Sequence, residues 1–145
     1  MFDVALVPIP AFSPDNLHPM LVNFTAALVP VSVGSDILGR VLRKPSMHTA
    51  AWWTILYAAA LTPLTAISGL WWKSREAGML PARTIAQHQW LGIGLVVCFI
   101  VLAVWRYKIY GKSVPPSVVY LTLGVVLVGA LVVQGALGGA MVFGD

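Results

Sequence analysis

Four long apolar segments fill most of this chain, and each can cross a lipid bilayer as a helix. A span needs about 20 residues to cross roughly 30 Å of hydrocarbon. We expect spans over residues 19–38, 49–70, 85–105 and 117–141. Only 10% of the residues are charged, against about 25% in soluble domains. These features exclude a water-soluble fold.

The segments between the spans are short, so neighbouring helices should run antiparallel. The predicted fold is therefore an all-α, integral membrane, up-down-up-down four-helix bundle, with residues 1–145 forming one transmembrane domain. Residues 1–16 lack a basic beginning and are interrupted by Pro8, Pro10 and Pro14, so they are neither a signal peptide nor a span. We expect them to form an extended tail.

The positive charges predict the orientation of the bundle, because cytoplasmic connectors are enriched in Lys and Arg. The first and third connectors together carry six such residues, and the second carries three. We therefore expect the first and third connectors in the cytoplasm and both termini on the outer, periplasmic side of a bacterial inner membrane. The net charge of +4 belongs to these connectors and does not indicate a nucleic-acid partner.

His18 and His88 begin the first and third spans, so the predicted topology places them at the same depth on the outer side. Two imidazoles at equal depth in a helical bundle are the arrangement that a b-type haem needs. Two unrelated interfacial histidines would give the same pattern. His48 begins the second span without a partner at its depth, which favours a simple interfacial position.

Small residues gather toward the same outer end of the bundle, namely Gly69, Gly135, Gly138 and Gly139. Glycine would let the helices approach a flat porphyrin, but small residues are also common wherever membrane helices pack together. Arg75 and Arg83 lie on the side where haem propionates would be, and Trp72 or Trp90 would pack beside the ring.

Two local features leave alternatives open. His18 precedes Pro19, so the helix begins there and leaves His18 at the interface, or it begins earlier and turns His18 inward. Asp36 lies four residues before Arg40, which favours an ion pair at the membrane surface over a proton relay. The sequence contains no catalytic, metal-binding or phosphate-binding motif.

The segment LHPMLVNFTAALVPVSVGSDILGR resembles the opening of a bacterial membrane-protein family, domain of unknown function 2231. Ser68-Gly69-Leu70, His88 and Gly138-Gly139 are similar to the motifs of its later helices. Many relatives carry a second histidine near the position of Asn23. The resemblance implies four helices, and its members occur fused to or beside Rieske iron-sulfur and c-type cytochrome domains. It therefore implies membrane electron transfer with partner subunits.

Two functional hypotheses follow. In the first, the chain is a small subunit of a respiratory or photosynthetic electron-transfer complex. One haem b bound by His18 and His88 would relay electrons between quinol and an outer-surface carrier, and a quinone is the second expected cofactor. In the second, the chain is a cofactor-free accessory subunit of a larger membrane complex.

Overall fold

A computed structural model of the chain describes residues 16–75, 82–110, 112 and 115–143, apart from the side chains at positions 75, 142 and 143. These residues form α1 (Leu17–Leu42), α2 (Pro45–Arg75), α3 (Ala82–Ile109) and α4 (Val118–Phe143). All four helices are long and apolar enough to cross a membrane, which confirms the predicted all-α bundle. Except for Asn16, the expected tail over residues 1–16 lies outside the described part.

The helices extend beyond most ends of the predicted spans, because only the apolar core of each helix crosses the hydrocarbon. The first connector is reduced to two residues between α1 and α2. Arg43 adopts a left-handed conformation with φ of 52°, and the Lys44 N–H donates to the Gly39 carbonyl at 3.0 Å. Pro45 then begins α2, where its missing N–H and fixed φ cost nothing.

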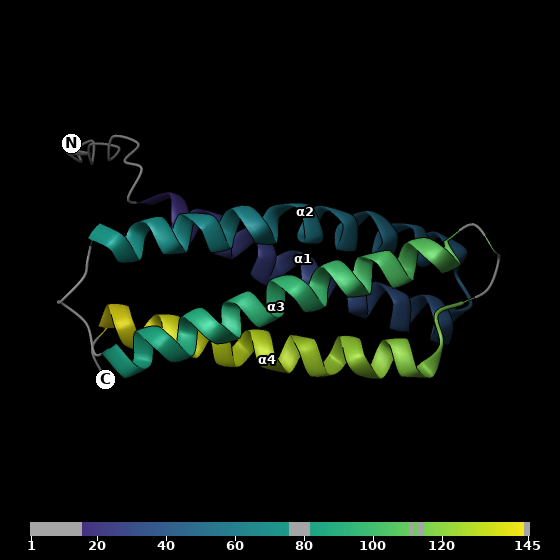
Figure 1. Cartoon of the computed structure of the whole chain (residues 1–145). Coiled ribbons are helices and arrows are strands. Elements are labelled where there is room, and N and C mark those ends of the chain that lie inside the picture. The colour runs from purple at the N-terminus through teal and green to yellow at the C-terminus, as the bar shows by residue number, and fades with distance from the viewer. Residues whose placement is uncertain (1–15, 76–81, 111, 113–114, 144–145) are drawn as a thin grey trace, which may run out of the picture.

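The helices lie in a ring in the order α1, α2, α3, α4, with α1 and α3 on one diagonal. Because the chain direction alternates, α1 and α3 begin at the end where α2 and α4 finish (Figure 1). We call this the His18 end and the opposite one the His48 end. Figure 1 shows α3 crossing the bundle obliquely, so that it lies away from α2 at the His18 end.

A buried polar cluster joins three helices at the His48 end. Asp36 on α1 has a side chain with 0% exposure and accepts hydrogen bonds from Arg106 Nε at 3.1 Å and Nη2 at 3.0 Å. His48 Nδ1 donates to the same carboxylate at 2.7 Å. The expected Asp36–Arg40 pair is therefore wrong, because Arg40 is exposed and donates to the Pro116 carbonyl. His48 is also not alone at its depth.

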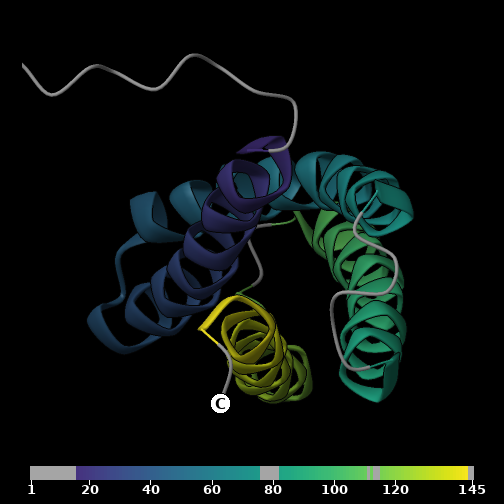
Figure 2. The ribbon, with the colours of Figure 1, turned by 90° about the vertical axis from the view of Figure 1, so that its left-hand side faces the viewer.

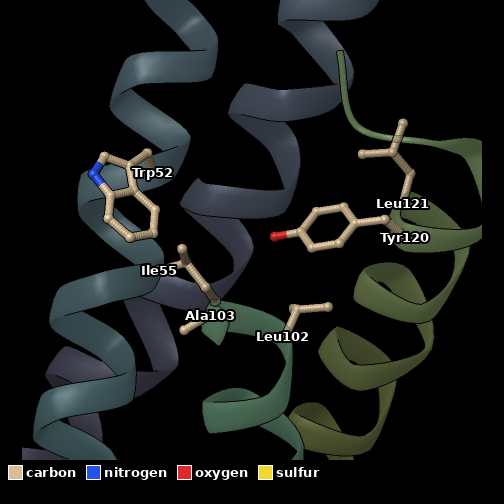
Figure 3. Close-up of a cluster of buried hydrophobic side chains, with 6 residues drawn as sticks. All are labelled: Trp52, Ile55, Leu102, Ala103, Tyr120 and Leu121. Carbon is tan, nitrogen blue, oxygen red and sulfur yellow. The ribbon is translucent and has the colours of Figure 1, made fainter. Parts of the chain in front are cut away.

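An aromatic and aliphatic cluster packs beside these charges. Figure 3 shows the Tyr120 ring reaching from α4 into the bundle toward the side of Trp52 and Ile55. Next along the bundle, Val29, Ala58, Leu95 and Phe99 form a second buried cluster. Their side chains are between 0% and 4% exposed, so an apolar layer separates the charges of the His48 end from the polar groups of the His18 end.

Candidate functional site

A cavity of about 180 Å³ lies between the four helices on the His18 side of the apolar layer. Its wall is mostly apolar, with Leu95 and Phe99 from the apolar layer contributing to it. Three wall threonines donate to carbonyls of their own helices, so their hydroxyl protons are already used. The polar residues along the wall are His18, Thr25, Thr62, Thr65, Lys73, His88, Gln89 and Gln134.

His18 faces into the bundle from the first turn of α1. The helix begins at Leu17, and Pro19 is tolerated because the first turn of a helix has no need of its N–H. His18 Nδ1 donates to the Thr65 carbonyl at 3.0 Å and lies 3.1 Å from Ser68 Oγ. A carbonyl can only accept, so Nδ1 carries the proton and Nε2 keeps its lone pair.

His88 enters from α3 and is held by a residue that the sequence analysis missed, Gln134 on α4. Gln134 Nε2 donates to the His88 carbonyl at 3.0 Å and lies 3.1 Å from His88 Nε2. The amide nitrogen can only donate, so His88 Nε2 accepts and Nδ1 carries the proton. Within the described residues, His88 Nδ1 and Gln134 Oε1 are buried without a hydrogen-bond partner.

The two imidazoles meet across the bundle, as their predicted depths required. Their ring centres are 6.4 Å apart and the planes are nearly perpendicular, at 82°. Trp72 stacks on His18, with ring centres 6.2 Å apart and planes at 22°. Trp90, the other candidate for packing beside a cofactor, is 69% exposed and does not line the cavity.

The predicted glycines have different surroundings. A Cβ at Gly69 would lie 2.7 Å from His18 Cε1, and one at Gly138 would lie 3.3 Å from His88 Cε1. These two glycines therefore make room for the imidazoles themselves. Gly135 lines the cavity and a Cβ there would meet nothing within 4 Å, whereas Gly139 does not line it.

The predicted arginines do not contribute described contacts to this cavity. Arg83 is exposed and does not line it, and the side chain of Arg75 lies outside the described part. Lys73 lines the cavity and donates to Gln89 Oε1, which links α2 to α3 beside it. No group of three His, Cys, Asp or Glu side chains within the described residues is placed to hold a metal ion.

The fold and the cavity define an all-α membrane protein with a paired-histidine site near one end. A family model described as "Predicted membrane protein (DUF2231)" matches residues 14–145. The chain belongs to this family, domain of unknown function 2231, as its motifs indicated. Comparison with curated proteins and with solved structures gives no match.

Proposed function

We propose that this chain is a small subunit of a respiratory or photosynthetic electron-transfer complex in a bacterial inner membrane. Its cavity would hold a redox-active group. Through this group, electrons would pass between membrane quinol and a carrier on the outer surface. The observation that supports this most strongly is the approach of two imidazoles, from diagonal helices, to 6.4 Å within a largely apolar cavity. A Rieske or c-type cytochrome partner is the proposed carrier.

Haem b is the first candidate for the bound group. One metal between two imidazoles would place the ring centres roughly 6 Å apart, because each ring adds a metal–nitrogen bond of about 2 Å and about 1 Å from that nitrogen to the ring centre. The spacing of His18 and His88 agrees with this value. The hydrogen bond from His18 Nδ1 to the Thr65 carbonyl fixes the orientation of the ring and would leave Nε2 free to bind iron. A bound haem would supply a one-electron redox centre.

Two features of the described arrangement do not fit a haem. Gln134 uses the Nε2 lone pair of His88, and the other ring nitrogen carries a proton. Iron ligation by His88 therefore requires the hydrogen bond from Gln134 to break or the imidazole ring to rotate. The cavity of about 180 Å³ is also smaller than the roughly 300–1,000 Å³ of pockets for drug-sized ligands. A porphyrin would enter only after helices move apart.

A dithionite-minus-air difference spectrum of the purified full chain, expressed with haem available, tests this candidate. We expect a sharp b-type α band that His88→Ala abolishes. The control is Gln87→Ala, an exposed neighbour that does not line the cavity, and it should keep the band. A flat spectrum from a preparation that is helical by circular dichroism rules out the haem.

The second candidate function is a cofactor-free accessory subunit. It is favoured by α4, where Tyr120, Leu121 and Gly124 are the only buried residues among those whose burial is described. Much of this helix therefore offers apolar surface to lipid or to a neighbouring subunit. Under this alternative, His88→Ala leaves assembly and thermal stability of the complex nearly unchanged.

A further inference from the structure

The volume of the cavity limits the size of the ligand that it can hold. Its volume of about 180 Å³ is close to the roughly 150 Å³ of an engineered apolar cavity that binds benzene. One six-membered ring with small substituents fits this space without movement of the helices. The ligand must also dissolve in the bilayer, because the cavity lies among membrane-spanning helices.

The wall offers a hydrogen-bond acceptor at His18. The Thr65 carbonyl fixes the proton on Nδ1, so Nε2 presents a lone pair. Ser68 Oγ donates to the same carbonyl at 2.8 Å, which strengthens this arrangement. Gln134 Nε2 is engaged with His88 and Lys73 with Gln89, whereas His88 Nδ1 and Gln134 Oε1 are buried without a partner among the described residues. A ring that carries a hydroxyl group is therefore complementary to the site.

The boundary between α2 and α3 provides a route for an apolar tail. Ala66 and Leu70 on α2 line the cavity, as do Ile93 and Val96 on α3. Leu70 is 46% exposed, so this wall continues onto the surface that faces the lipid. In Figure 1, α2 and α3 diverge toward the His18 end. A hydrophobic tail attached to the ring would pass between them into the bilayer.

We propose that this cavity binds the headgroup of a membrane quinol, with one quinol hydroxyl donating to His18 Nε2 and the tail leaving between α2 and α3. This inference rests on the proposed electron-transfer function, in which quinol is the membrane partner. It differs from the haem candidate because the quinol, rather than a haem, lies between the two histidines. The two occupants exclude each other because they use the same space.

The test is anaerobic isothermal titration calorimetry of the full chain in detergent with a decyl-tailed benzoquinol. The comparison ligand is its dimethyl ether, which keeps the ring and the tail but has no hydroxyl donor. We expect the ether to bind about tenfold more weakly, as loss of one hydrogen bond to a buried acceptor predicts. His18→Ala should remove this difference. Equal affinity of the wild-type chain for both ligands would overturn the proposal.

A second pair of variants keeps the test valid if His18→Ala does not fold. Gly135→Leu places a side chain in the cavity, where a Cβ meets nothing within 4 Å. It should abolish quinol binding. The matched control is Gly129→Leu on the same helix, which also has open space around its Cβ but lies outside the cavity, and it should bind normally. Unchanged binding by Gly135→Leu would also overturn the proposal.

The calorimetry and the difference spectrum separate this inference from the haem candidate. Quinol binding with a flat spectrum supports the quinol site and removes the haem. A haem band without quinol binding overturns the quinol site and leaves the electron-transfer function standing. A flat spectrum with no quinol binding overturns both and favours the accessory subunit.

Discussion

Asp36 lies in the buried polar cluster, where Arg106 contacts both of its carboxylate oxygens and His48 donates to one of them. Removing one partner of a buried ion pair leaves an uncompensated charge and typically costs about 3–5 kcal/mol. We expect Arg106→Leu to lower the free energy of unfolding by about that amount, whereas the double variant Asp36→Leu/Arg106→Leu should recover more than half of it. Denaturant unfolding in detergent, followed by circular dichroism, measures both changes.

Arg40→Leu is the matched control, because Arg40 was the partner expected from its spacing to Asp36. It is exposed and donates to the Pro116 carbonyl rather than to the carboxylate. Its loss should cost less than about 1 kcal/mol. A cost as large as that of Arg106→Leu would mean that Asp36 depends on Arg40 after all.

Single residues also show which parts of the site a sequence can predict. The depths of His18 and His88 follow from span topology, and the structure brings the two rings together. Their partners depend on how the helices rotate against one another, which spacing alone does not fix. Gln134 did give a signal, since a polar amide within an apolar span usually has a partner in the bundle. The presence of this amide in the span does not by itself show that its partner is His88.

Among the elements, the contact between α1 and α4 depends on close packing at Gly124. A Cβ there would lie 2.9 Å from Val33 Cγ2, so Gly124→Ala must displace α1 or the valine. Overpacking of this kind costs about 1–3 kcal/mol. Gly129→Ala on the same helix meets nothing within 4 Å and should be neutral or stabilising, because Ala favours helix by up to about 1 kcal/mol. Thermal unfolding in detergent compares the two.

The opposite ranking of these variants would show that α1 and α4 do not pack as described. Helices were predictable as elements because apolar length alone demands them in a membrane. Their ends were less predictable, since α2 begins at Pro45 and ends at Arg75, several residues beyond the predicted span of 49–70.

At the scale of the whole molecule, the orientation in the membrane decides which compartment the cavity faces. Arg106 is neutralised by Asp36, so the cations remaining at the His48 end are Arg40, Arg43, Lys44, Lys108 and Lys112. They still outnumber the three of the opposite connector, and a bias of Lys and Arg sets topology. We therefore expect the His48 end in the cytoplasm and the cavity near the outer surface.

Labelling of introduced cysteines in intact cells tests this orientation, after Cys98→Ser removes the single native thiol. Arg83→Cys at the His18 end should react with a membrane-impermeant maleimide from outside, whereas Lys44→Cys should react only after lysis. The reverse pattern would place the cavity beside the cytoplasm. A carrier on the outer surface could not then reach a group held by His18 and His88, whether haem or quinol, so the electron-transfer proposal depends on this result as much as on either ligand.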